Sequence, residues 1–347
     1  MLARSQAKGD AVSGDKILLT GGAGYIGSHT AVALAEAGYA PVVLDNFSNA
    51  KPSVLERLEM ILGVPVALER GDILDRAFLA DVFTRHEFGA VIHFAARKAV
   101  GESVARPMDY FETNCCGLTA LLRTMEASGV RNLVFSSSAT VYGEPDVFPV
   151  PETAPRWHTS PYAMTKLASE DLLLAMADAD PFWAFGILRY FNPAGAHESG
   201  LIGEEPDGIP NNLMPYLAKV ALGELPHLNV FGDDFPTPDG TGVRDFVHVM
   251  DLAEAHVSSL RTLLDGSGGH AVNIGTGEGS SVMQMLASYG RACGRDLPWK
   301  PGPRRAGDVA KLVADPSLAA SVLKFRTRRT LDEMCESSWR WVTRNSR

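Results

Sequence analysis

The residues best suited to chemistry in this chain are a tyrosine and a lysine in the run Ser160-Pro161-Tyr162-Ala163-Met164-Thr165-Lys166. A serine before a proline is typical of a helix N-cap and the first helical position, so we expect a helix through about Met176. Tyr162 and Lys166 would then lie on one face of that helix. An ammonium beside a phenol favours the phenolate and lowers a tyrosine pKa from about 10 toward neutral. Such a tyrosine can act as a general acid or base.

The same stretch also fits a purely structural role. Leu167, Leu173 and Leu174 form an apolar stripe along the expected helix. Lys166 could pair on the surface with Glu170, one helical turn further on, beside a packed tyrosine. The rest of the chain favours the chemical role, because it supplies a nucleotide loop and a serine at a strand end.

The glycine-rich loop follows the first predicted strand. Lys16 to Thr20 is apolar, Gly21-Gly22-Ala23-Gly24-Tyr25-Ile26-Gly27 follows at once, and Ser28 to Ala37 has helical character. Pro41 to Leu44 is the next predicted strand and leads into Asp45. Such a loop lets the backbone approach a pyrophosphate, and the carboxylate can accept hydrogen bonds from an adenosine ribose. Because the carboxylate would repel a 2′-phosphate, the sequence predicts NAD rather than NADP.

Strands and helices continue to alternate. We expect strands over 64–68, 90–95, 131–135 and 185–188, and helices near 74–85, 109–127 and 162–176. This alternation predicts an α/β fold with a doubly wound, Rossmann-type parallel sheet, in which ligands gather at the carboxyl ends of the strands. Those ends carry polar residues here, including Ser138, Asn192 and the pair Asp72-Ile73, which could hold an adenine edge.

The composition changes after Asn192, where glycine and proline become frequent through Gly242. We expect a flexible extension over 1–15, a dinucleotide-binding domain over 16–192 and a smaller mixed α/β substrate domain over 193–347, with 243–275 returning elements to the first domain. Within that region the sequence predicts a strand over 243–249, a helix from Asp251, a strand over 272–274, an arginine-rich loop over 301–308 and a final helix over 331–342.

Composition narrows the class of protein further. The 347 residues carry a net charge of −9 and show no basic stripe, so nucleic acid is not an expected partner. No apolar run approaches the roughly 18 residues of a membrane span, and the polar start does not resemble a secretory signal. The nine histidines lack metal-ligand spacing, so no metal is expected. The four cysteines have neither disulfide nor zinc spacing and indicate packed, reduced thiols in a cytoplasmic protein: Cys115, Cys116, Cys293 and Cys335.

A serine, a Tyr-x-x-x-Lys and a nucleotide loop form the constellation of the short-chain dehydrogenases/reductases. Within the extended group of that superfamily the chain resembles the UDP-glucose 4-epimerase (UDP-galactose 4-epimerase) family, from about Lys16 to the final helix. The most specific runs are Phe135 to Gly143 and Arg189 to Pro193. Further similar runs are Thr20 to Ser28, Val91 to Ser103, Leu188 to Ala196, Gly208 to Pro215 and Gly240 to Leu252.

The resemblance implies NAD-dependent epimerisation at C4 of UDP-hexoses, which interconverts UDP-glucose and UDP-galactose. Tyr162 would take the proton of the sugar 4-hydroxyl while the C4 hydride passes to NAD⁺, giving a 4-keto sugar that turns and takes the hydride back on its other face. Ser138 would orient the 4-oxygen. Lys166 would bind the nicotinamide ribose and, with the positive nicotinamide, lower the pKa of Tyr162.

The resemblance also implies two sets of contacts. Those with NAD would come from Gly21, Gly24, Tyr25, Ile26, Gly27, Asp45, Asn46, Asn49, Asp72, Ile73, Phe94, Ala95, Lys98, Asn114, Ser136, Tyr162, Lys166 and Tyr190. Those with the UDP-sugar would come from Lys98, Ser138, Tyr162, Asn192, Asn212, Leu213, Arg244, Arg305, Asp308 and Leu312. Arginine suits a diphosphate because its guanidinium offers a bidentate fork.

Leu312 departs from the family pattern, which often has tyrosine or a smaller residue such as cysteine there. A large side chain narrows the room beside the sugar C2 group, so an intermediate leucine leaves the choice between plain and N-acetylated sugars open. C4 epimerisation of other UDP-sugars, N-acetylated or pentose, is therefore the alternative.

Two rival functions are less well supported. A nucleotide-sugar dehydratase or decarboxylase shares the fold, but dehydratases place Asp-Glu just after the strand-end hydroxyl, where this chain has Ala139-Thr140. A non-catalytic NAD-binding regulator would have no need of Ser138, Tyr162 and Lys166 together.

The family precedent also predicts a homodimer. The expected helices over 109–127 and 162–176 contain apolar residues and could pair across a two-fold axis into a four-helix contact.

Overall fold

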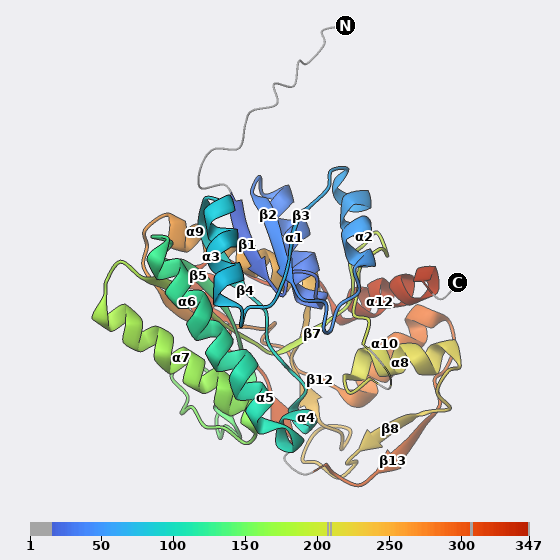
Figure 1. The fold of residues 1–347 in the computed structure, drawn as a ribbon. Helices are drawn as coiled ribbons and strands as arrows, with labels where there is room; N and C mark the ends of the chain where they lie inside the picture. Colours follow the sequence, from blue (N-terminus) through green and yellow to red (C-terminus); the bar gives the residue numbers. More distant parts are fainter. Residues whose placement is uncertain (1–15, 207, 209, 306–307, 346–347) are drawn as a thin grey trace, which may run out of the picture.

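The computed structural model describes residues 16–206, 208, 210–305 and 308–345, so the expected extension over 1–15 lies outside the described residues. Its centre is a seven-stranded sheet of order β11-β6-β5-β4-β1-β2-β3 (Figure 1). Every neighbouring pair in this sheet is parallel, which confirms the predicted doubly wound fold. The strands are β1 (Lys16–Thr20), β2 (Ala40–Asp45), β3 (Ala67–Arg70), β4 (Phe88–His93), β5 (Asn132–Ser138), β6 (Ala184–Tyr190) and β11 (His270–Ile274).

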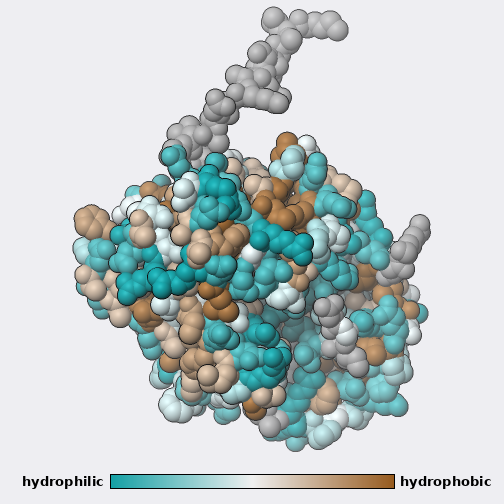
Figure 2. All heavy atoms as spheres, viewed as in Figure 1, coloured by the Kyte–Doolittle hydropathy of each residue, from teal (hydrophilic) through white to brown (hydrophobic). Residues whose placement is uncertain are grey.

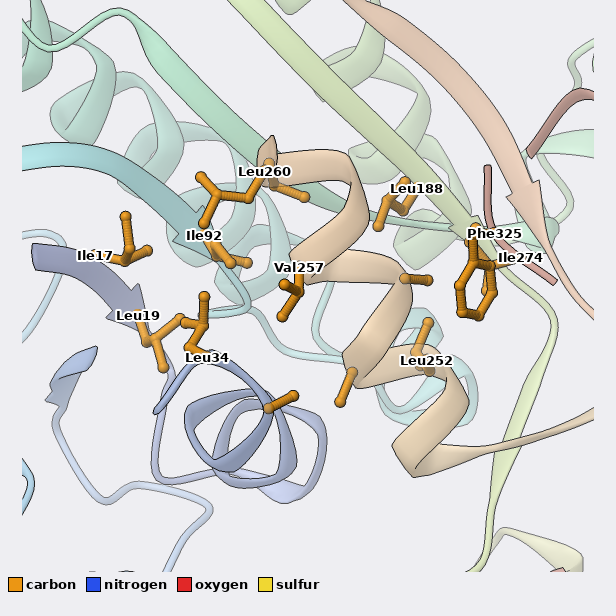
Figure 3. Close-up of a cluster of buried hydrophobic side chains, with 14 of the residues drawn as sticks. Ile17, Leu19, Leu34, Ile92, Leu188, Leu252, Val257, Leu260, Ile274 and Phe325 are labelled. Carbon is orange, nitrogen blue, oxygen red and sulfur yellow. The ribbon is translucent and has the colours of Figure 1, made fainter. Parts of the chain in front are cut away.

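Helices cover both faces of this sheet, because its strands are apolar on both sides. One face packs on α3 (Arg76–Arg85), α6 (Gly117–Ala127) and α7 (Pro161–Ala179). The other packs on α1 (Tyr25–Glu36), α2 (Ser53–Leu62), α9 (Val249–Leu264) and α11 (Ser317–Val322). Figure 3 shows Val257 and Leu260 of α9 in the second of these cores, together with Ile17 and Ile92 of the sheet.

The later part of the chain builds a second core around three helices, α8 (Leu213–Leu222), α10 (Val282–Cys293) and α12 (Leu331–Asn345). Three small sheets accompany it. They contain β8 (Leu228–Phe231) with β13 (Trp299–Gly302), β7 (Asn192–Ala194) with β10 (Phe246–His248), and β9 (Val243–Arg244) between β12 (Ser280–Ser281) and β14 (Lys311–Leu312). Two elements that come after α8 in the chain return to the first part of the molecule. Strand β11 pairs with β6 in the large sheet, and helix α9 packs against α1.

Several element boundaries differ from the sequence-based expectation. The helix expected over 109–127 is interrupted by one π-helical turn, η1 (Glu112–Cys116), between α5 (Pro107–Phe111) and α6, and a short α4 (Val100–Ala105) precedes it. The strand expected over 64–68 is found at β3, and the loop expected over 301–308 begins inside β13.

The strand expected over 243–249 is split between β9 and β10 at Asp245. This carboxylate is fully buried and accepts hydrogen bonds from the backbone nitrogens of Thr276 (2.8 Å), Gly277 (3.0 Å) and Ala314 (3.1 Å). At Asp245 the backbone also changes partners: its nitrogen bonds the Leu312 carbonyl oxygen of β14, whereas its carbonyl oxygen accepts from Asn192 of β7. The expected strand is therefore divided between two small sheets.

Hydrophobic side chains remain exposed on α7 and on the neighbouring short helices. Leu172, Leu174 and Met164 of α7 are each at least about a third exposed, and Met108 of α5 is 77% exposed. A groove of about 240 Å³ lies between α6 and α7. In Figure 2 hydrophobic side chains are scattered among hydrophilic ones on the face shown. No helix among the described residues is both long and apolar enough to span a bilayer.

Candidate active site

The N-terminal end of α7 places Tyr162 and Lys166 as the sequence predicts. Ser160 is the N-cap, its hydroxyl oxygen accepts a hydrogen bond from the Ala163 backbone nitrogen at 3.2 Å, and Pro161 is the first helical residue. The Lys166 side chain runs into the protein, where its ammonium donates to the backbone carbonyl oxygen of Ser136 at 2.5 Å. Helix α7 is thereby tied to strand β5.

The alternative of a surface pair between Lys166 and Glu170 is wrong. Glu170 is fully buried and accepts hydrogen bonds from Arg189 Nε (3.0 Å) and Nη2 (2.8 Å) and from Ser137 Oγ (2.5 Å). Arg156 adds a further ion pair at 3.1 Å. The apolar stripe is also only partly confirmed, because Leu173 is buried whereas Leu174 is 43% exposed.

Ser138 ends β5 directly before the short 3₁₀ helix η2 (Ala139–Tyr142) and contacts Tyr162. Its oxygen accepts hydrogen bonds from the backbone nitrogen (3.2 Å) and the hydroxyl (3.0 Å) of Thr140. Because both lone pairs of the Ser138 oxygen are engaged by Thr140, the hydroxyl hydrogen points away from Thr140 and is available to another acceptor. A hydroxyl at this position can donate to Tyr162 or to a substrate oxygen.

The electrostatics of the pair differ from the simple expectation. Burial raises the pKa of Tyr162 to about 12, against a smaller lowering by the Ser138 hydrogen bond. Burial also lowers the pKa of Lys166 to about 8. Burial therefore disfavours the phenolate of Tyr162, and a positive charge nearby would favour it.

The glycine loop joins β1 to α1 beside the end of β4. Gly21 has a φ of +69° and is so close to the neighbouring strand that a Cβ there would lie 2.7 Å from the Ala95 backbone nitrogen. A Cβ at Gly27 would lie 2.5 Å from the Gly21 carbonyl oxygen. Gly24 is the N-cap of α1, and no side chain caps the N–H groups of the first helical turn. This turn includes Tyr25 and Ile26.

Asp45 lies at the end of β2, next to this loop. Its carboxylate accepts hydrogen bonds from the backbone nitrogens of Ala23 (3.0 Å) and Phe47 (2.8 Å), and burial raises its pKa. Asn46 donates to Asp72 at 2.8 Å. Three residues expected to contact NAD, which come from two different strand ends, are therefore brought together: Asp45, Asn46 and Asp72. Asn49 is exposed on the same loop, and Ile73 is buried.

The residues expected after β4 serve a second purpose in the fold. The Asn114 amide accepts from the Arg97 backbone nitrogen (2.8 Å) and donates to Thr165 Oγ1 (2.9 Å), so it connects the β4 loop to α7 from inside the π-helical turn. Lys98, next to Arg97, is half exposed and lies 3.5 Å from Glu204. Phe94 is held to β1 by a backbone bond to Thr20 at 2.9 Å.

The expected sugar-nucleotide residues form two groups. In the first, β9 and β14 pair so that Arg244 is opposite Leu312, and Arg244 lies 3.6 Å from Asp308. Leu312 is partly buried against a small cluster that includes Phe191 and Val141, the latter from the turn that follows Ser138. The structure thus brings the residue expected to face C2 of the sugar to the serine turn.

In the second group Asn212, the N-cap of α8, donates to Glu204 at 2.7 Å, so Asn212 and Lys98 share one carboxylate. Leu213 is the first residue of α8, and the backbone nitrogen of Asn192 bonds the Asp245 carbonyl oxygen at 2.9 Å. Tyr25 is also expected near NAD, and its hydroxyl donates a hydrogen bond to the Gly195 carbonyl oxygen at 2.7 Å.

Sequence reasoning missed three residues of this site. Glu204 contacts two expected ligand residues, Lys98 and Asn212, and Thr140 bonds Ser138. The third is Phe231, whose ring lies 3.9 Å beneath the guanidinium of Arg305, which the sequence did predict. Thr140 could have been found from its place in the run that follows Ser138. Glu204 and Phe231 come from a Gly- and Pro-rich region with no periodic pattern, where the sequence carries no signal. Among the described residues no group of three or more His, Cys, Asp or Glu is arranged to hold a metal ion.

Comparisons with known proteins agree over most of the chain. The model of the NAD dependent epimerase/dehydratase family matches residues 17–275. UDP-glucose 4-epimerase of Bacillus subtilis (strain 168) is 51% identical over 329 residues, 95% of this chain and 97% of that protein. UDP-glucose 4-epimerase of Mus musculus is 52% identical over 338 residues, again 95% and 97%.

Solved structures match over a similar share of the chain. UDP-glucose 4-epimerase of Stenotrophomonas maltophila, with bound NAD and formylated UDP-arabinopyranose, matches with a TM-score of 0.94 at 47% identity, over 95% of this chain and 98% of that one. The UDP-Glc/GlcNAc 4-epimerase of Campylobacter jejuni matches with a TM-score of 0.83 at 35% identity, over 95% and 100%.

Proposed function

The chain belongs to the NAD-dependent epimerase/dehydratase family, and on that premise we propose that it interconverts UDP-glucose and UDP-galactose by epimerisation at C4 of the sugar. The observation that carries this is the convergence of Ser138, Tyr162 and the buried Lys166 where β5 meets α7, in the sheet that carries the glycine loop. A hydroxyl, a phenol and an ammonium at the carboxyl end of a parallel sheet suit proton transfer at a sugar hydroxyl.

The loop and strand ends fit NAD. The uncapped first turn of α1 behind Gly24 offers backbone N–H groups to a diphosphate, and Asp45 provides a carboxylate where an adenosine ribose is expected. We assign the adenosine end to Asn46, Asn49, Asp72 and Ile73, and the nicotinamide end to Phe94, Lys98, Asn114, Ser136 and Tyr190. When bound, NAD supplies the hydride acceptor and donor for C4.

Tyr162 takes the proton of the 4-hydroxyl and later returns it. Ser138 binds and orients the 4-oxygen, because its own lone pairs are already engaged by Thr140. Lys166, held by the Ser136 carbonyl, places a positive charge at the base of the site and binds the nicotinamide ribose. Since burial alone raises the pKa of Tyr162, the positive nicotinamide has to contribute to stabilising the phenolate.

The UDP-sugar is held by the two groups around β9 and α8. Arg244 and Arg305 provide guanidinium groups for the diphosphate, and Asp308 accepts from the uridine ribose. Asn192, Asn212 and Leu213 line the sugar. The Phe231 ring packs against the Arg305 guanidinium and supports it from one side.

We further propose a homodimer in which α6 and α7 of two subunits meet. The exposed apolar side chains Met164, Leu172 and Leu174 and the groove between the two helices are the surface that such a contact would cover. Light scattering at micromolar concentration should give twice the 37.3 kDa chain mass, and the monomer mass would contradict this proposal.

Domain roles and location complete the proposal. We assign NAD binding to 16–192 together with 243–275, and UDP-sugar binding mainly to the rest of 193–347. The four cysteines, all free thiols, support a reducing compartment such as the cytoplasm.

The test of the function is a turnover assay with a panel of UDP-sugars, begun with UDP-galactose and no added cofactor. We expect UDP-glucose as the product, and nicotinamide dinucleotide in the supernatant of the denatured protein. A 4-keto-6-deoxy product would indicate a dehydratase, and NADP in place of NAD would contradict the role given to Asp45.

A further inference from the structure

A histidine lies behind the expected cofactor residues, on a helix from the later part of the chain. His256 of α9 is fully buried, and its Nε2 is hydrogen-bonded to the hydroxyl of Tyr190 at the end of β6. Its ring also lies 4.8 Å from the ring of Phe94, centroid to centroid. Tyr190 and Phe94 are both assigned to NAD, whereas His256 lies behind them and has no assigned role in the site.

The direction of these hydrogen bonds is determined by the chemistry of the partners. His256 Nδ1 lies 2.7 Å from the carbonyl oxygen of Leu252, which can only accept, so Nδ1 carries a proton. Burial lowers the pKa of His256 to about 4, so the ring is neutral at working pH and Nε2 has no proton. The Tyr190 hydroxyl must therefore donate to His256.

The same chain of bonds reaches the residue that anchors the active-site lysine. The Ser136 side chain interacts with the Tyr190 hydroxyl and favours its ionised form, and because the Tyr190 hydrogen is engaged by His256, Ser136 is on the donor side of this interaction. The Ser136 carbonyl oxygen accepts from Lys166 at 2.5 Å. A line of polar interactions thus runs from Ser136 through Tyr190 to His256, and its hydrogen bonds from Tyr190 to His256 and from His256 to Leu252 end on α9.

Helix α9 is a rigid support for this line. The neighbours of His256 on the helix, including Val257 and Leu260, pack in the core between α1 and the sheet (Figure 3). A buried, fully paired polar network in such a setting fixes the orientation of its members.

We propose that His256 is a positioning residue for the reaction: by accepting the Tyr190 hydroxyl hydrogen it fixes Tyr190 and Ser136 against the nicotinamide end of the cofactor and beside the Lys166 ammonium. This inference rests on the proposed function, since it takes Tyr190 as a contact of bound NAD. It differs from a role in packing alone, because it acts through one hydroxyl group.

The test is a double-mutant cycle between His256 and Tyr190. His256→Leu removes the acceptor, His256→Gln restores an amide oxygen near the place of Nε2, and Tyr190→Phe removes the donor. Ser259→Ala is the matched control, because it deletes another buried hydrogen bond of α9, to His270 at 2.8 Å, away from the site. The readouts are kcat, KM for UDP-galactose, the rate at which NAD leaves the protein, and the melting temperature.

We expect His256→Leu to lower kcat by about 5- to 50-fold with KM within about twofold of wild type, the size of one lost buried hydrogen bond. In the Tyr190→Phe background the same change should lower kcat by less than about twofold further. His256→Gln should recover most of the loss, and Ser259→Ala should lower the melting temperature with little change in kcat.

Equal effects of His256→Leu in both backgrounds, in kcat and in NAD release, would overturn the inference, as would a His256→Gln protein as slow as His256→Leu. These outcomes are distinct from a failure of the proposed function. If the wild-type protein converts no UDP-sugar, the function is wrong, and the coupling of His256 to Tyr190 is still measured by NAD release.

Discussion

Lys166 donates from its ammonium to the backbone carbonyl oxygen of Ser136 at 2.5 Å, and this bond fastens α7 to β5. Tyr162 stands one turn earlier on α7, and Ser138 stands two residues later on β5. The lysine to which we assign the positive charge thus also helps to hold Tyr162 near Ser138. Removing Lys166 should disturb both geometry and electrostatics.

Lys166→Met should shift the pH dependence of the reaction. The phenolate of Tyr162 is the form that accepts a proton, so loss of a nearby positive charge raises its pKa and moves the ascending limb of kcat/KM to higher pH. A shift of about one unit would lower the rate at neutral pH by about tenfold. Unchanged pH profiles in wild-type and variant proteins would show that Lys166 does not act on Tyr162.

Tyr162→Phe should nearly abolish epimerisation while UDP binding persists, because the phenol oxygen moves the proton and other residues hold UDP. General acid–base groups contribute roughly 10²–10⁴-fold to a rate. UDP affinity by calorimetry is the control for an intact site. A variant that keeps more than about a tenth of wild-type turnover would remove Tyr162 from the mechanism.

Glu170→Gln should destabilise the fold. The change leaves the Arg189 guanidinium buried without its carboxylate, a loss of about 3–5 kcal/mol in unfolding free energy. Asp171→Asn is the matched control, because Asp171 also pairs with Arg156 but is 52% exposed, where such a pair contributes about 0–1 kcal/mol. Denaturant unfolding with NAD present measures the unfolding free energy of both variants. Equal losses in the two variants would show that the buried pair of Glu170 and Arg189 contributes no more to stability than the exposed pair of Asp171 and Arg156.

Leu312→Cys tests sugar choice. Leu312 lies beside the turn after Ser138 and is only partly buried, so its methyl groups should hinder an acetamido group at C2 as the sugar turns. We expect a roughly 10–200-fold preference of wild type for UDP-galactose over UDP-N-acetylgalactosamine. The cysteine variant should gain on the N-acetylated substrate with little change on UDP-galactose, whereas Leu312→Met should not. If kcat/KM of the two substrates is already equal in wild type, another residue sets the choice.

The sequence was most informative where local rules decide the structure. The Ser160 cap, the glycine loop and the strand-end serines could be predicted from short sequence spacings. The parallel sheet could be predicted because the expected strands alternate with helices. The site's inner supports could not be predicted in this way. Glu170 reads as a surface residue on its helix, and His256 as an ordinary helix residue, because their partners Arg189 and Tyr190 become neighbours only through the three-dimensional fold.

The most direct test of the central claim is the fate of the hydrogen at C4. Incubate the protein with UDP-galactose deuterated at C4 in ordinary water and analyse the UDP-glucose formed by proton NMR and mass spectrometry. If Tyr162 moves only the hydroxyl proton and the hydride returns to the same sugar, the product retains its deuterium at C4. Loss of deuterium to the solvent, or no UDP-glucose at all, would contradict the account.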